Sequence, residues 1–161
     1  MISAAKSVGK RLEMLTGQVG MSHRYVIDID KSTYDLGSWS KAAGLGVKWS
    51  KESHRPGRTT HETIVPGNVS YSDIALSRAA GAESGRVQGW LVSVTRDRRP
   101  LTGAIYMVDF LGMPIIKWQL KEFFPIGWRL SEFDSSGSRP AIETLELAHA
   151  GFLEAEARLL P

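Results

Sequence analysis

A period-two alternation of apolar and polar residues in short segments is the feature that most constrains the fold. It is clearest at residues 117–121, where lysine and glutamine alternate with Trp118 and Leu120. Residues 25–29 alternate in the same way. Because successive side chains of a strand point to opposite faces, this pattern is typical of antiparallel strands with one buried face. We therefore predict a mainly β fold.

Turn residues between the alternating segments divide the chain into about eight expected strands. The segments of the second half are 104–110, 115–121, 123–131 and 141–150, and those of the first half lie within 25–30, 36–45, 45–50, 64–71 and 74–78. Residues 111–114 are expected to form a hairpin connection, and residues 123–128, which contain a proline and a glycine, are expected to turn the chain.

One segment follows a helical period instead. Its apolar residues recur at i, i+3, i+4 and i+7, namely Val87, Trp90, Leu91 and Val94. Pro100 stops the pattern. We expect an amphipathic helix at about 84–96 in a β-rich α+β fold, whose sheet curls around this helix or packs under it. The predicted architecture is a curled antiparallel β-sandwich or barrel with this one helix.

Composition and charge exclude several classes of protein. The 161 residues suit one domain and contain no cysteine, which excludes disulfides and thiolate metal sites. The chain has no apolar run of the roughly 18 residues that a membrane span needs, so we expect no span and no Sec-type export. The net charge of +3 is small, and its densest cluster, residues 96–99, follows the predicted helix, where cations meet the negative end of the helix dipole. We therefore expect no sequence-specific nucleic-acid binding.

The chain divides into an N-terminal extension, residues 1–22, and one β domain, residues 23–161. The extension has moderate helix propensity that is weakened by glycines. Two interpretations stay open for it, a frayed arm and a helical arm that docks on a neighbouring molecule.

A search for catalytic and metal-binding motifs gives none. His61 and Glu62 begin like a zinc-protease helix, but Val65 stands where the second histidine is needed. Glu143 and Glu146 fall on opposite faces of an expected strand, so they do not converge as a carboxylate pair. There is no Gly-x-Ser-x-Gly elbow and no phosphate-binding glycine loop. We predict a non-enzyme without catalytic residues, metal ligands or cofactor.

The five tryptophans differ in their expected roles. Trp49, Trp90 and Trp118 each fall on the apolar side of their element, which predicts core positions. Trp39 and Trp128 lie near expected turns and are candidates for inter-subunit contact, because tryptophan is enriched at interface anchors. A remote alternative is a β-barrel that stacks single-stranded nucleic acid on its aromatic rings.

A polar stretch at residues 51–60 interrupts the apolar pattern between two expected strands. It contains the sequence Arg55-Pro56-Gly57-Arg58. Two interpretations fit it, a solvated loop and a protruding β-arm.

Several of these segments together resemble the tail tube proteins of contractile phages and of extracellular contractile injection systems. The most specific match is the closing segment 141–149, Ala-Ile-Glu-Thr-Leu-Glu-Leu-Ala-His. The tryptophan-bearing segment 117–121, the proline-containing segment 123–128 and the opening segment 25–30 also match, and the resemblance runs over roughly 24–154. The chain departs from the family in lacking its usual asparagine-phenylalanine pair near Trp118.

The resemblance implies a tail-tube fold and a structural role. Members form hexameric rings that stack into a tube inside a sheath, on a baseplate hub or spike, with a channel for a cargo effector or phage DNA. It favours the β-arm for residues 51–60, with Arg55, Pro56, Gly57 and Arg58 contacting an adjacent subunit. It also leaves an alternative, a tube-initiating ring that joins the tube to the baseplate hub. Assembly is expected in the bacterial cytoplasm.

Overall fold

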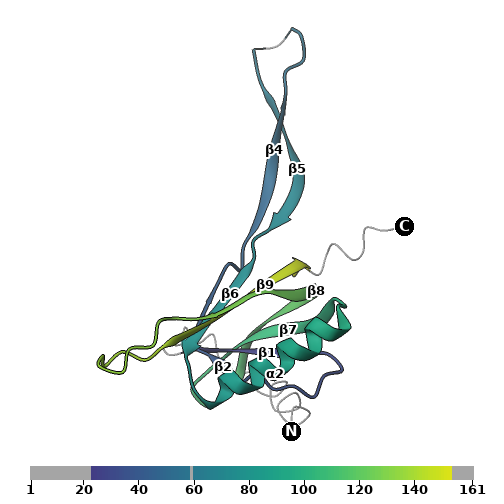
Figure 1. Ribbon diagram of the computed structural model, residues 1–161. Helices are drawn as coiled ribbons and strands as arrows, with labels where there is room; N and C mark the ends of the chain where they lie inside the picture. Colours follow the sequence, from purple (N-terminus) through teal and green to yellow (C-terminus); the bar gives the residue numbers. More distant parts are fainter. Residues whose placement is uncertain (1–22, 59, 154–161) are drawn as a thin grey trace.

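The computed structural model describes residues 23–58 and 60–153. That part of the chain forms a seven-stranded antiparallel sheet, a two-stranded hairpin and one helix (Figure 1), which confirms the prediction of a mainly β fold. The elements are β1 (Arg24–Ile29), β2 (Ser38–Trp39), β3 (Lys41–Ala43), β4 (Val47–His54), β5 (Thr63–Tyr71), β6 (Ile74–Ala79), α2 (Ala82–Asp97), β7 (Leu101–Val108), β8 (Pro114–Leu130) and β9 (Ile142–Gly151). The predicted extension, residues 1–22, lies outside the described residues.

The large sheet has the strand order β2-β1-β7-β8-β9-β6-β3 and curls back on itself. Its two end strands, β2 and β3, are consecutive in the chain and are separated only by Ser40. The backbone N–H and the hydroxyl of Ser40 both donate to the carbonyl oxygen of Ser77, at 3.1 and 3.0 Å. In addition, β1 lies near β3 and β2 near β6. The two edges of the sheet therefore meet at one short bent segment.

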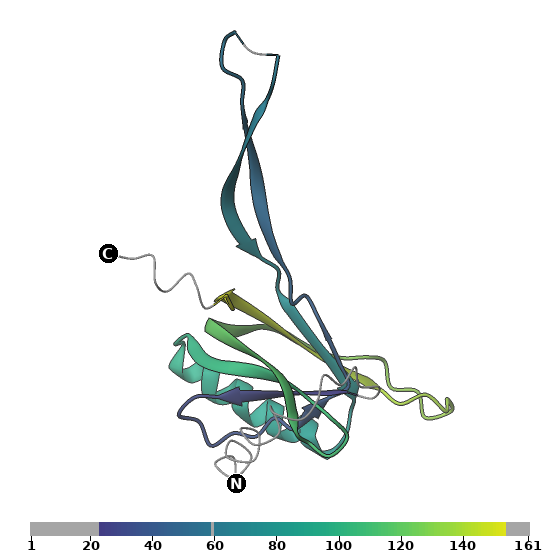
Figure 2. The same cartoon turned by 180° about the vertical axis from the view of Figure 1, so that it is seen from behind.

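The core lies inside this curled sheet, and α2 packs along it (Figures 1 and 2). Val87 and Trp90 of the helix are buried against residues from the strands, among them Phe123. The helix begins after Gly81, whose N–H bonds to the hydroxyl of Ser84 at 3.2 Å, and Pro100 follows its end. The predicted helix and the core position of Trp90 are confirmed.

The turn expected at residues 123–128 is wrong, because β8 continues through this segment as one strand. It bends instead, at Glu122 with a φ of 36° and at a register shift between Pro125 and Gly127. A β-bulge accommodates a proline because it interrupts the ladder locally and re-aims the strand. The hairpin connection before β8 forms as predicted, and the Asp109 carboxylate accepts hydrogen bonds from the backbone N–H groups of Leu111 and Met113 at 2.9 and 2.8 Å.

Strands β4 and β5 pair only with each other and project from the body as a long twisted hairpin (Figures 1 and 2). We call this hairpin, residues 47–71, the arm. Of the two interpretations of residues 51–60, the protruding β-arm is therefore correct. The core position expected for Trp49 is wrong, since its side chain is 56% exposed. No described element forms a second layer against which an apolar side chain of the arm could pack.

Candidate assembly surface

The arm leaves apolar side chains and backbone edges uncovered. Its exposed apolar residues are Trp49, Ile64, Val65 and Val69. Trp49 and Val69 are directly opposite each other across the two strands. Within the described residues, each arm strand has the other as its sole ladder partner, so the outer edge of each is open. A lone two-stranded ribbon is only marginally stable in water, and open edges favour pairing with other chains.

The candidate contact residues from the sequence lie at the tip of the arm. Arg55, Pro56, Gly57 and Arg58 are all exposed there, and the Arg58 N–H donates to the Pro56 carbonyl at 2.7 Å in a tight turn. The tip thus presents two guanidinium groups far from the body (Figure 1). Contact with another subunit stays a prediction for these four residues.

The root of the arm is fixed to the body by a ring cluster. Tyr71 packs against His149 and Phe152, with ring centroids 5.5 and 5.4 Å away. His149 Nε2 donates to the Ser72 carbonyl at 3.0 Å, so this histidine has a structural role at the root. Gly151 has a φ of 145°, and a Cβ there would lie 2.9 Å from the Tyr71 ring. These contacts hold the direction of the arm without a partner.

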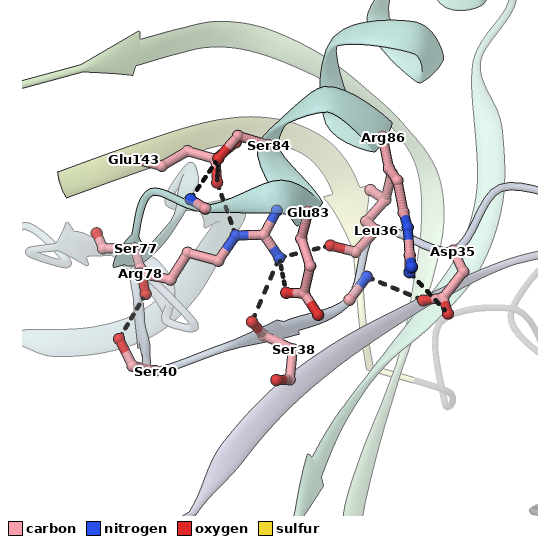
Figure 3. A network of polar contacts seen from close by, with 12 residues as sticks. Asp35, Leu36, Ser38, Ser40, Ser77, Arg78, Glu83, Ser84, Arg86 and Glu143 are labelled. Atoms are coloured by element: carbon pink, nitrogen blue, oxygen red, sulfur yellow. Dashed lines mark hydrogen bonds and ion pairs between the residues drawn. The ribbon is translucent and has the colours of Figure 1, made fainter. Parts of the chain in front are cut away.

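A buried ion pair lies inside the body, between Arg78 of β6 and Glu143 of β9 (Figure 3). Both residues are at most 5% exposed, and Arg78 Nε lies 2.6 Å from Glu143 Oε2. The same carboxylate accepts hydrogen bonds from the Ser84 hydroxyl and the Trp128 indole N–H, both at 2.9 Å. These bonds offset the cost of removing the charge from water.

The Arg78 guanidinium also joins the segment that leads into β2. Its Nη1 donates to the carbonyl oxygens of Leu36 and Ser38 at 2.6 and 3.3 Å and pairs with Glu83 at 2.9 Å. The guanidinium lies 4.1 Å from the centroid of the Trp39 ring. One charged group therefore connects β6, β9 and the first turn of α2 with the segment where the two edges of the curled sheet meet, which we call the seam.

A surface groove of about 610 Å3 lies between the C-terminal end of α2 and the bend of β8. Its apolar lining includes Leu91, Val94, Phe124, Ile126 and Trp128. The lining also contains Arg98 and Arg99, both exposed. Phe124 and Ile126 are nearly half exposed, so the groove leaves apolar surface in contact with water.

Two further searches of residues 23–58 and 60–153 gave negative results. No helix in this part has the length and apolar character needed to cross a bilayer. No three His, Cys, Asp or Glu side chains converge there to hold a metal ion.

Comparison with protein families matches residues 21–153 to the T4-like virus tail tube protein gp19 family. The chain belongs to the T4-like virus tail tube protein family. It is thus a structural tube subunit, as the resemblance implied. A search among curated proteins found no match to this sequence.

Solved structures share the fold of this tail tube protein at low sequence identity. A chain of the sheath-tube complex of an extracellular contractile injection system, PVC, matches with a TM-score of 0.67 and 14% identity, over 87% of this chain and 92% of that one. A chain of the tube-terminating cap of the anti-feeding prophage gives 0.64 and 16%, over 83% and 87%. A chain of the baseplate of the anti-feeding prophage gives 0.59 and 18%, over 84% and 93%.

The two candidate interface tryptophans of the tail tube protein differ in burial. Trp39 is fully buried beneath Arg78, so its assignment to inter-subunit contact is wrong. Trp128 is half-buried, donates its N–H inward to Glu143 and also lines the groove, so contact with another subunit stays a prediction. Trp118, expected in the core, is half-buried and packs against it.

Sequence reasoning missed the buried ion pair of this tail tube protein, although the sequence carries a signal for it. Arg78 follows Ile74 and Leu76 at intervals of two, so it shares their buried face. Glu143 precedes Leu145 and Leu147 in the same way, whereas Glu146 falls on the other face as predicted. A charged residue on each of two apolar faces indicates an internal pair, because an unpaired buried charge is strongly destabilising.

Proposed function

We propose that this tube subunit forms hexameric rings that stack into a tube with a central channel, and that the arm of each copy packs on a neighbouring copy. The observation that carries the proposal is the arm itself. It has four exposed apolar side chains, two open edges and a root that is already fixed in direction. A neighbouring subunit would remove this apolar surface from water and complete the ladders. Rings that stack through unlike surfaces grow into a filament.

The proposed setting is a phage tail or an extracellular contractile particle that assembles in the bacterial cytoplasm. A sheath would surround the tube, a baseplate hub or spike would carry it, and a cargo effector or phage DNA would occupy the channel. Support comes from family membership and from the fold shared with chains of a sheath-tube complex and of a baseplate. The fold shared with the baseplate chain also supports an alternative, a tube-initiating ring on the baseplate hub.

Shortening the arm tests the proposal. Lys51 pairs with Pro66, so residues 52–65 can be replaced by Asn-Gly, a sequence that favours a two-residue hairpin turn. We expect native mass spectrometry and electron microscopy to show hexamers and stacked rings for the full protein. The shortened variant should keep its circular dichroism spectrum and melting temperature but fail to stack.

A matched control is Phe110→Ser, which changes an exposed apolar residue of the body and leaves the arm intact. Stacked rings from the shortened variant at wild-type yield would contradict the role of the arm. Long tubes of the full protein support a bulk tube subunit, whereas single or paired rings support the tube-initiating alternative.

A further inference from the structure

An exposed aromatic residue marks the loop between β8 and β9. Phe133 is 71% exposed, and Glu132 and Asp134 stand on either side of it in the chain. We call these three residues the knob. The loop projects from the body on the side opposite the C-terminal end of α2, as both views show (Figures 1 and 2).

Hydrogen bonds shape the loop that carries the knob. At its base, the Ser131 N–H donates to the Ile142 carbonyl at 2.8 Å, and the Ile142 N–H donates to the Ser131 hydroxyl at 2.7 Å. Near its tip, the hydroxyl and N–H of Ser136 both donate to the Asp134 carboxylate and lower the pKa of that group. The lowered pKa keeps the Asp134 carboxylate ionised at neutral pH, so the knob combines an exposed aromatic ring with an adjacent negative charge.

The groove at the end of α2 has the complementary chemistry. Its volume of about 610 Å3 is ample for a phenyl ring, since a buried apolar cavity of about 150 Å3 is enough to bind benzene. Phe124 and Ile126 supply exposed apolar surface, and Arg98 and Arg99 supply two cations. An aromatic side chain next to carboxylates could cover the apolar surface of the groove and pair with its two cations.

We propose that the knob of one copy docks in the groove of a second copy, with Phe133 against Phe124 and Ile126 and the carboxylates near Arg98 and Arg99. The loop that carries the knob lies on the side of the subunit opposite the C-terminal end of α2 (Figure 1), which lines the groove, so knob and groove meet only between different molecules. Such a contact joins unlike surfaces head to tail and therefore builds a ring or a filament. The inference rests on the proposed self-assembly but adds a second contact, which does not involve the arm.

Cysteine cross-linking tests this contact, because the chain has no native cysteine. The double variant Ser135→Cys/Thr95→Cys has one cysteine beside the knob and one in the groove lining and keeps every residue of the proposed contact, so oxidation should give a covalent ladder that extends beyond dimers. The matched control is Phe110→Cys/Thr95→Cys, since Phe110 is 75% exposed at the tip of a different loop. The control should give no ladder beyond dimers. Equal ladders from the two variants would overturn the inference.

A second measurement does not depend on the cysteines. Docking would remove the Phe133 ring from water, so Phe133→Ala should raise the protein concentration needed for assembly by about 10- to 100-fold. Phe110→Ala should leave it unchanged. Charge reversal gives a further check, because Glu132→Lys and Arg99→Glu should each weaken assembly, and their combination should restore it.

The outcomes separate this inference from the proposed function. If the Phe133→Ala protein assembles at the wild-type concentration, the knob does not dock in the groove, so the inference is wrong while the proposed function stands. If the native protein forms no oligomer under concentrated native conditions, both are wrong.

Discussion

The body and the arm are built from the same alternating strand pattern but bury it differently. In the body, apolar residues such as Trp39, Trp90 and Phe123 lie inside a curled sheet that α2 closes. In the arm, Trp49 and Ile64 remain in contact with water. Alternation thus specifies an amphipathic strand, whereas the chain topology decides whether its apolar face is buried within the subunit or left exposed.

Charged residues show the same contrast. The body encloses Arg78 and Glu143 and satisfies the carboxylate with three donors. The arm keeps its arginines exposed at the tip. The body therefore pairs its buried charges internally, whereas the arm leaves charged and apolar side chains exposed.

The comparison is tested most strongly by two matched tryptophan substitutions. Trp90→Ala should lower the free energy of unfolding by about 3–5 kcal/mol, because it empties a buried site. Trp49→Ala should change it by less than about 0.5 kcal/mol and should weaken assembly instead. Urea denaturation followed by circular dichroism measures the first effect, and sedimentation measures the second. Similar losses of stability from both would abolish the distinction between body and arm.

A smaller loss of stability is expected when the charge of buried Glu143 is removed. Glu143→Gln removes the buried carboxylate partner of Arg78 and leaves it the partly exposed Glu83, so it should lower the free energy of unfolding by about 1.5–3 kcal/mol. Glu146→Gln is the matched control on the same strand, since Glu146 pairs with exposed Arg129 and such a surface pair contributes about 0.2–1 kcal/mol. Chemical denaturation compares the two variants. A larger loss for Glu146→Gln would show that the buried pair does not stabilise the body.

A smaller loss of stability than that of Glu143→Gln should come from the arm root. His149→Ala removes one hydrogen bond to Ser72 and a ring contact, so we expect a loss of about 0.5–1.5 kcal/mol in the free energy of unfolding. Assembly should suffer more than this loss suggests, because the direction of the arm is no longer fixed before binding. Thermal denaturation and electron microscopy of the same sample compare the two effects. Normal tubes from this variant would show that the root contacts are dispensable for assembly.

Much of the fold follows from local patterns in the sequence. The strand near Tyr25, the helix of Val87 and Trp90 and the closing strand were predictable, because each carries its own periodicity. The turn expected around Pro125 was wrong because a bulge can absorb a proline without ending the strand. No local pattern shows which strands lie under a second layer.

The candidate site was predictable in part. The polar composition of residues 51–60 and the family resemblance together located the arm and its tip. Trp39, expected at an interface, is buried, and Trp49, expected in the core, is exposed. Their burial was not predictable because it depends on contacts between residues distant in sequence. The groove combines the end of α2 with the bend of β8, and only the folded chain brings these together.

The seam at Ser40 has a consequence for the free subunit before polymerisation. Because the large sheet ends in two short strands that share one bend, it offers no long flat edge on which cross-β stacking could begin. The body of a free subunit is therefore a poor template for amyloid-like aggregation. The arm remains the one described segment with long unpaired strand edges, so aggregation of the free subunit should begin there.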